Sequence, residues 1–240
     1  MLLFPNVFTK QRMIEDYNLT NLFTGLSYTA EYPRNLVFHE HEKTIAIKKR
    51  YGSEKLEMIA YMPTWRGLTS TALEIAGYAE ELKKILQVLD ETLNDDQMLY
   101  VNLHSLVKDV IPIQGYQHIC SFPEGVDNYE FLMGCDMLIT DYSSVLFDFA
   151  LTKRPVILFV YDAEEYARDR GMYFSVQDLP FVKAETLKQL QEYITKQKSV
   201  EISKAAWNAY ADVFVSKAAF DPAVCLKKVP VDSITCLLYT

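Results

Sequence analysis

The sequence predicts an α/β fold built on a doubly wound parallel sheet. Short apolar runs recur along the chain, at lengths typical of buried strands. Segments with helical spacing of leucine and isoleucine separate several of these runs. Half of the residues are hydrophobic, which is enough to bury a sizeable core. Strands that alternate with helices are typical of parallel βαβ units, so we expect one sheet with helices packed against it.

The predicted strands are short and mostly apolar. The first is "MIAYMPT", in which Pro63 stops the strand because proline cannot donate to a ladder. Three of the later runs end in a polar residue: His104, Asp141 and Asp162. The strands are expected at residues 58–64, 98–104, 118–123, 136–141 and 154–162.

The predicted helices are recognised by their period and by their first residues. Leu82, Ile85 and Leu89 recur at helical intervals, and charged residues occupy the opposite face. Asp127 stands where a side chain caps the first turn of a helix. Residues 65–77 are predicted to form a polar loop. The helices are expected at residues 78–93, 127–135, 143–153, 184–198 and 204–215.

Composition excludes several classes of protein. The formal net charge of −8 makes the chain a poor general partner for nucleic acid or anionic lipid. The four cysteines lie far apart, without a C-x-x-C pair, so neither a disulfide scaffold nor a zinc site is predicted. No apolar stretch approaches the roughly 20 residues that a membrane-spanning helix needs.

The stretch "MLITDYSSVLFDFA", residues 137–150, places polar groups between two apolar runs. Asp141 falls at the end of a predicted strand, and Ser143 and Ser144 begin the helix that follows. Ligands of open α/β sheets bind beyond the carboxyl ends of the strands, and hydroxyls at a helix start can donate to phosphate. The pattern therefore indicates a phosphate or diphosphate site. The alternative is purely structural: a helix cap with a buried aspartate that orders its loop.

Two other predicted strands end in residues of the same kind. Trp65 and Arg66 follow the first strand in "PTWRG", and His104 follows the second in "NLHS". Arginine can bind phosphate in a bidentate manner, and histidine can donate to a phosphate oxygen or move a proton. Each of these side chains could instead have only a structural role. Together they predict one site, because parallel strands end at a common edge.

These stretches, with the earlier "EYPRN" and the long run from Asp127 to Tyr173, resemble a known family in order and spacing. The family is that of the CDP-glycerol:poly(glycerophosphate) glycerophosphotransferases, the teichoic acid polymerases and primases of cell-wall synthesis. The match covers roughly residues 30–215, and "ITDYSSVLFDFA" followed by "RPVILFVYD" is its most specific part. The family is similar to GT-B glycosyltransferases, in which two Rossmann-like domains face each other.

The resemblance implies a function and a set of site residues. The activity would be transfer of glycerol phosphate from CDP-glycerol to the terminal hydroxyl of a lipid-linked glycerophosphate acceptor, with release of CMP. Ser143 and Ser144 would contact the donor diphosphate, Asp141 would order their loop, and Arg66 would lie near the phosphates. His104 would be the catalytic residue that assists the transferred phosphoryl group. Asp127 would approach the ribose or the glycerol of the donor.

The resemblance also implies partners and a location. CDP-glycerol and the lipid-linked acceptor are the expected partners, no cofactor or metal is expected, and nucleic acid is not a partner. The enzyme would be cytoplasmic and peripheral on the inner face of the cell membrane. Two positions depart from the family pattern: Glu31 stands where glycine is usual, and Leu36 stands where aspartate is usual.

The resemblance reaches only the C-terminal half of the family. A "TWHG"-like motif of the first domain is not found, and too few residues precede Met58 for such a domain. We expect a donor-binding half with three parts. Residues 1–52 would be an irregular segment left from the first domain and linker, residues 53–220 the Rossmann-like CDP-glycerol-binding domain, and residues 221–240 a C-terminal tail. A separate N-terminal half or a homo-oligomer would then complete the enzyme.

Two other functions remain open from the sequence. The same arrangement of residues would suit a GT-B glycosyltransferase that uses a sugar nucleotide. A non-catalytic fragment that binds a nucleotide or a partner chain would also fit, because the chain lacks the first-domain motif.

Overall fold

The computed structural model describes residues 2–52, 56–67, 69, 71–196 and 200–221. The described chain forms two compact units, which divide between His39 and Glu40 and again between Ile202 and Ser203. Each unit is described by itself. The predicted C-terminal tail, residues 221–240, lies outside the described residues except for Asp221.

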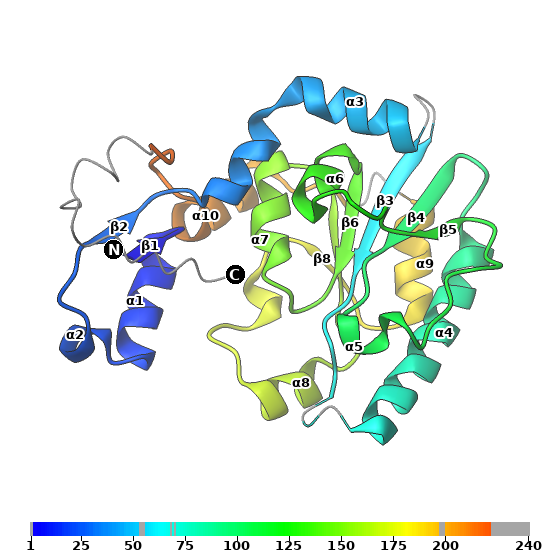
Figure 1. The fold of residues 1–240 in the computed structure, drawn as a ribbon, viewed down its shortest axis with the longest axis horizontal. Coiled ribbons are helices and arrows are strands. Elements are labelled where there is room, and N and C mark those ends of the chain that lie inside the picture. The colour runs from blue at the N-terminus through cyan, green and yellow to red at the C-terminus, as the bar shows by residue number, and fades with distance from the viewer. Residues whose placement is uncertain (1, 53–55, 68, 70, 197–199, 222–240) are drawn as a thin grey trace. The chain divides into compact units, whose positions relative to one another are not determined.

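The larger unit contains a parallel sheet of six strands in the order β5-β4-β3-β6-β7-β8 (Figure 1). All five neighbouring pairs of strands run parallel. The predicted doubly wound parallel α/β fold is confirmed. Its strands are β3 Glu57–Met62, β4 Gln97–Val101, β5 Ile119–Ser121, β6 Met137–Thr140, β7 Val156–Phe159 and β8 Val182–Ala184.

Helices cover both faces of this sheet. On one face, alternate strand residues such as Ile59 and Leu99 form a core with Leu82 and Leu86 of the long helix α4. On the other face, Tyr100 packs against Phe131 of α6, with ring centroids 4.9 Å apart. The helices of this unit are α3 His41–Tyr51, α4 Ala72–Thr92, α5 Ser105–Lys108, α6 Asn128–Gly134, α7 Val145–Phe149, α8 Ala163–Arg170 and α9 Leu187–Thr195, with 3-10 turns η2 Ala150–Thr152 and η3 Val176–Asp178.

The smaller unit joins the two ends of the described chain. The strands β1 Leu2–Phe4 and β2 Ser27–Thr29 pair in parallel. Phe8 of α1 packs edge-on against Phe214 of α10, with centroids 5.3 Å apart, and the Asn6 amide donates to the Phe214 carbonyl at 2.8 Å. Its helices are α1 Val7–Asp16, α2 Leu19–Leu22 and α10 Lys204–Phe214, with the 3-10 helix η1 Pro33–His39.

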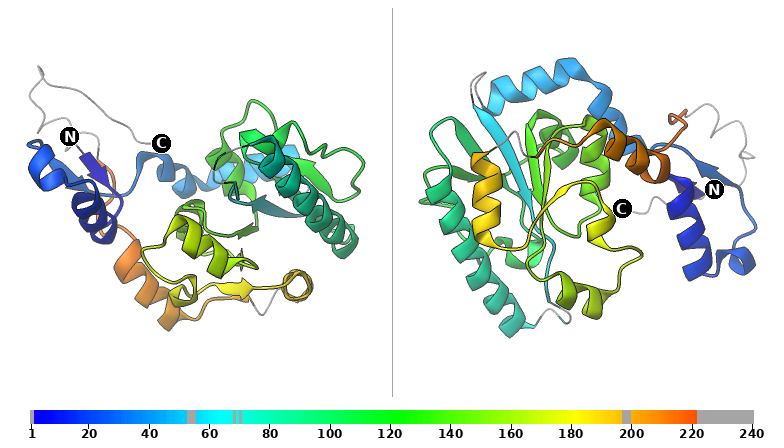
Figure 2. Two further views of the ribbon diagram at one scale, coloured as in Figure 1. Left: turned by 90° about the horizontal axis from the view of Figure 1, so that it is seen from below. Right: turned by 180° about the vertical axis from the view of Figure 1, so that it is seen from behind.

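The divisions between units differ from the boundaries predicted after residues 52 and 220. Residues 1–52 were expected to be irregular, but α1 and α3 lie within them. The helix α3 belongs to the larger unit because it packs on α6, where Tyr51 meets Phe131 edge-on at 5.5 Å and Lys48 pairs with Asp136. Figure 2 shows the two units from two further directions.

The start of α4 lies within the stretch that was predicted to be a loop. Thr71 caps the helix by accepting from the backbone N–H of Glu74 at 3.3 Å, and the Glu74 side chain accepts from the N–H of Thr71 at 3.0 Å. This capping box satisfies two backbone donors that the first turn would otherwise leave free. The helix therefore begins at Ala72, six residues before the predicted start.

Removing this cap gives a test of the local fold. Replacing Thr71 with alanine is expected to lower the free energy of unfolding by about 1 kcal/mol, because the N–H of Glu74 loses its acceptor. Urea unfolding followed by circular dichroism measures the change. Leu73→Ala is the control: this side chain is 84% exposed in the same turn, and its loss should matter by less than about 0.5 kcal/mol. Equal stability of Thr71→Ala and the parent chain would contradict the capping role.

Candidate functional site

The strand order of the larger unit points to one edge of the sheet as a candidate ligand site. From β3 the chain proceeds through β4 to β5 on one side, and from β6 through β7 to β8 on the other side. Strands β3 and β6 are therefore neighbours at the point where the strand order reverses. Open α/β sheets bind ligands beyond the carboxyl ends of the two strands that flank such a point. Residues 63–67 and 141–144 follow those two strands.

Asp141 lies at the centre of this edge. It directly follows β6 and is 2% exposed. The backbone N–H of Thr64 donates to both of its carboxylate oxygens, at 3.1 and 2.9 Å, and the Thr64 hydroxyl donates to Oδ1 at 2.5 Å. The N–H of Tyr142 donates to the same oxygen at 2.6 Å. Asp141 thus ties the loop after β3 to the loop after β6.

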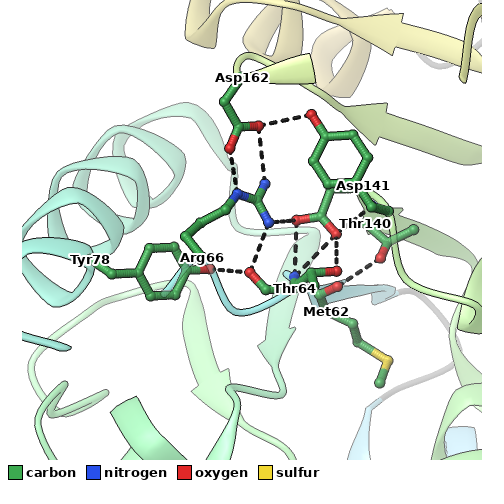
Figure 3. A network of polar contacts seen from close by, with 8 residues as sticks. Met62, Thr64, Arg66, Tyr78, Thr140, Asp141 and Asp162 are labelled. Carbon is green, nitrogen blue, oxygen red and sulfur yellow. Dashed lines mark hydrogen bonds and ion pairs between the residues drawn. The ribbon is translucent and has the colours of Figure 1, made fainter. Parts of the chain in front are cut away.

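Arg66 bridges two carboxylates (Figure 3). Its Nη1 lies 2.9 Å from Oδ2 of Asp141, and its Nε donates to Oδ2 of Asp162 at 2.5 Å. A third bond runs from Nη1 to the carbonyl oxygen of Thr64, at 2.8 Å. Because Asp162 follows β7, this one guanidinium joins the carboxyl ends of β3, β6 and β7. Its side chain is only 13% exposed.

Burial and neighbouring groups both act on the pKa values of Arg66 and Tyr142. Desolvation lowers the pKa of Arg66, but the adjacent carboxylates of Asp141 and Asp162 outweigh it and raise that pKa overall. Burial also raises the pKa of Tyr142, and the bond that its hydroxyl donates to Asp162, 2.8 Å long, raises it further. Tyr142 is therefore a neutral donor. One positive charge faces two negative ones, so Arg66 has no unpaired charge to offer an anion.

Aromatic rings enclose the guanidinium. The Cζ atom of Arg66 lies 5.0 Å from the ring centroid of Tyr142, 5.7 Å from that of Tyr161 and 5.5 Å from that of Tyr166. Tyr142 and Tyr166 stack on each other at 3.8 Å. Cation–π contacts of this kind strengthen when water is excluded, so they help to hold Arg66 in place.

Ser143 and Ser144 form the start of the helix after Asp141. The hydroxyl oxygen of Ser143 accepts from the backbone N–H of Val145 at 3.4 Å. Ser144 is the N-cap residue of α7, but its side chain makes no capping hydrogen bond, and the residue is exposed. Both hydroxyls can still donate a hydrogen bond, because an accepting hydroxyl keeps its own proton.

His104 follows β4 and is the N-cap residue of α5. Its Nδ1 accepts from the backbone N–H of Leu106 at 3.3 Å. Its ring stacks on the indole of Trp65, with centroids 6.2 Å apart and planes 26° apart. Because Trp65 directly precedes Arg66 in the chain, the imidazole lies beside the loop that carries Arg66.

Asp127 has a different position. It caps α6, where one carboxylate oxygen accepts from the N–H groups of Tyr129 and Glu130 at 2.9 and 3.1 Å. The helix cap predicted for it is confirmed. Among the described residues, no contact joins Asp127 to the network around Arg66.

Thr64, Tyr142 and Asp162, which bond directly to Asp141 or Arg66, were not predicted as site residues. Thr64 and Tyr142 are neighbours of predicted residues, and Asp162 ends the predicted strand "RPVILFVYD". Asp162 had the same sequence signal as Asp141, an aspartate at the end of an apolar run, and could have been proposed on that ground.

Comparison with known proteins identifies the family of the chain. The family model described as CDP-Glycerol:Poly(glycerophosphate) glycerophosphotransferase matches residues 6–218. The chain belongs to this family. The resemblance inferred from "PTWRG", "NLHS" and "ITDYSSVLFDFA" is thereby confirmed.

Curated relatives within the glycerophosphotransferase family are proteins of teichoic acid synthesis. The chain is 35% identical over 161 residues to the teichoic acid poly(glycerol phosphate) polymerase of Staphylococcus epidermidis. This alignment covers 62% of the chain and 22% of the relative. It is 36% identical over 186 residues to the polymerase of the same name from Bacillus subtilis, covering 72% of the chain and 24% of that protein. The teichoic acid glycerol-phosphate primase of Bacillus subtilis is 26% identical over 217 residues, and this alignment covers 86% of the chain and 51% of the primase. The chain thus spans between a fifth and about half of the length of these relatives.

Solved structures of a family member show the same fold. A variant of the wall teichoic acid polymerase TagF superposes with a TM-score of 0.72 at 24% identity, over 95% of the chain and 56% of that protein. The same polymerase variant soaked with CDPG gives a TM-score of 0.67 at 26% identity, over 89% and 51%. In the part of the chain that the structure describes, no helix is both long and apolar enough to cross a membrane.

Proposed function

We propose that this chain binds CDP-glycerol and takes part in the transfer of its glycerol phosphate to the terminal hydroxyl of a lipid-linked glycerophosphate acceptor. The observation that carries the proposal is the strand order, which puts Asp141, Ser143 and Ser144 at the reversal point between β3 and β6. Membership of the glycerophosphotransferase family supplies the chemical identity of the donor and of the reaction.

The two serines are the proposed contacts of the donor diphosphate. Asp141 holds their loop against the loop after β3 through its bonds to Thr64 and Tyr142. Arg66 was expected near the phosphates, but its guanidinium is already paired with the carboxylates of Asp141 and Asp162. We therefore assign Arg66 to positioning: it fixes the three strand ends between which the diphosphate is held. Asp127 remains a proposed contact of the ribose or glycerol.

His104 is the proposed catalytic residue. Its Nδ1 accepts a hydrogen bond from Leu106, so in the neutral ring the proton lies on Nε2. An Nε2–H group can donate to an oxygen of the phosphoryl group as charge develops there. In the reaction, the acceptor oxygen forms a bond to the β-phosphorus, the bond from that phosphorus to the bridging oxygen breaks, and CMP leaves with the electron pair. The acceptor hydroxyl gives up its proton, which requires a base.

The lipid-linked acceptor determines where in the cell such an enzyme would act. A lipid-linked glycerophosphate chain is anchored in a membrane, so the protein would bind peripherally at the inner face of the cell membrane.

Calorimetric titration of the chain with CDP-glycerol, CMP and UDP-glucose tests the proposal. We expect CDP-glycerol and CMP to bind and UDP-glucose to bind at least about tenfold more weakly. Equal binding of UDP-glucose would favour a sugar-nucleotide glycosyltransferase instead. Incubation with CDP-glycerol and a lipid-linked acceptor, followed by measurement of CMP, separates a transferase from a fragment that only binds the nucleotide.

Removal of both serine hydroxyls is expected to weaken donor binding. In the double variant Ser143→Ala and Ser144→Ala, the Kd for CDP-glycerol should rise by about 5- to 150-fold, because about 1–3 kcal/mol of hydrogen bonding to a charged group is lost. Titration calorimetry measures the Kd. Ser105→Ala is the matched control, since Ser105 begins α5 and not α7. A folded double variant with an unchanged Kd would contradict a phosphate contact at these serines.

A further inference from the structure

Trp65 is a buried side chain next to the proposed catalytic histidine. The residue is 7% exposed and follows β3 by three positions. Its indole Nε1–H is buried and has no hydrogen-bond partner among the described residues. An indole N–H normally finds an acceptor when it is buried, so leaving it unpaired is costly.

The indole is held from three directions. Tyr78 of α4 meets it edge-on, with ring centroids 5.3 Å apart. Gly67 covers it so closely that a Cβ atom there would lie 2.0 Å from Cζ2 and 2.6 Å from Cε2 of the indole. Arg170 at the end of α8 donates to the carbonyl oxygen of Gly67 and so fixes this backbone against the ring. On the third side lies the imidazole of His104.

The imidazole, in contrast, has few supports of its own. His104 is exposed, and its one hydrogen bond among the described residues is the one that Nδ1 accepts from Leu106. That bond is 3.3 Å long and leaves the ring free to tilt about it. The stack on Trp65 restricts that tilt, because offset ring pairs prefer nearly parallel planes.

We propose that Trp65 is the positioning residue of His104: it fixes the plane of the imidazole so that Nδ1 keeps its bond to Leu106 and Nε2 presents its proton to the substrate. In this role Trp65 acts through the imidazole and needs no contact of its own with donor or acceptor. Its catalytic relevance rests on the proposed function, but its control of the imidazole does not.

The same arrangement explains why residue 67 is a glycine. No larger residue fits at this position without moving the indole, because a Cβ atom would lie only 2.0 Å from the nearest ring carbon. The substitution Gly67→Ala therefore displaces Trp65 while it leaves the stacking ring itself in the protein.

The ¹⁵N spectrum of the histidine side chains tests the proposal. Protonated and unprotonated ring nitrogens have widely different shifts, and a His104→Gln variant identifies the signals of His104. At about pH 8, where histidine is ordinarily neutral, the parent chain should show His104 with its proton on Nε2. In Trp65→Leu the ratio of this tautomer to the other should fall by about three- to tenfold, the scale of one aromatic contact. Trp207→Leu, in the smaller unit, should leave the ratio unchanged.

Two results would overturn the proposal. One is a parent chain whose His104 carries its proton on Nδ1, and the other is a folded Trp65→Leu protein with the parent tautomer ratio. If Trp65→Leu does not fold, Gly67→Ala decides in the same way, with an unchanged ratio again as the contrary result.

Titration of the same proteins with CDP-glycerol separates this inference from the proposed function. Where both hold, Trp65→Leu lowers the rate of CMP release more than it raises the Kd for CDP-glycerol, because the imidazole is misplaced and the serines are not. Where the parent chain fails to bind CDP-glycerol but Trp65→Leu still shifts the tautomer ratio, the proposed function fails and the positioning role stands.

Discussion

Replacing Arg66 with methionine is expected to lower the free energy of unfolding by about 3–5 kcal/mol, because it leaves two buried carboxylates without their shared partner. Asp141 and Asp162 have side chains only 3% and 14% exposed, so water replaces the guanidinium poorly, above all at Asp141. Urea unfolding, followed by both fluorescence and circular dichroism, measures the loss.

Two further variants sharpen the test. Arg168→Met removes an arginine that is 70% exposed and, among the described residues, paired only with Asp169, and it should change stability by less than about 0.5 kcal/mol. Adding Asp162→Asn to Arg66→Met should restore part of the lost stability, since one of the two unpaired charges is then gone. An Arg66→Met protein within about 1 kcal/mol of the parent would show that the network contributes little.

Replacing His104 with glutamine is expected to lower the rate of CMP release by about 10²- to 10⁴-fold, the usual contribution of a positioned proton donor or acceptor. Glutamine removes the imidazole Nε2–H group from the position after β4 but keeps a polar side chain. The rate is measured with CDP-glycerol and a lipid-linked acceptor at saturating donor, so that a change in Kd does not enter.

His39→Gln is the matched control for this variant. His39 is exposed, contacts Glu31 at 3.0 Å and belongs to the smaller unit, so its loss should leave the rate unchanged. A His104→Gln rate within about threefold of the parent rate would remove His104 from the chemistry. Circular dichroism of both variants establishes that each is folded.

The sequence predicted five of the six strands of the larger unit, including β5 at one edge, but neither β8 at the other edge nor the helix α3. β3, β4, β6 and β7 are buried on both faces and read as apolar runs with clear ends. β8 is three residues long and only partly buried, so it has no such run, and it was not predicted. The helix α3 was not predicted because its apolar residues are few and its packing partner α6 lies far along the chain.

The site was predicted in its location more fully than in its contacts. Asp141, Ser143, Arg66 and His104 were placed at one edge because parallel strands end together, and the strand order bears that out. The bond from Arg66 to Asp162 spans 96 positions. No local sequence pattern predicts such a contact, because the contact depends on which strands become neighbours in the sheet. The sequence therefore suggested a free arginine where the structure has a paired one.

The central pair of strands also sets the order in which the molecule can assemble. The Thr140 hydroxyl reaches the Met62 carbonyl across 78 positions, at the pair β3 and β6. Closing so long a loop costs chain entropy before any contact repays it, which makes distant parallel pairing a slow event in folding. The edge that carries Asp141 exists only after this closure, so we expect the proposed ligand-binding edge to form late in folding. A bound nucleotide would accordingly retard unfolding of the entire sheet rather than stiffen a single loop.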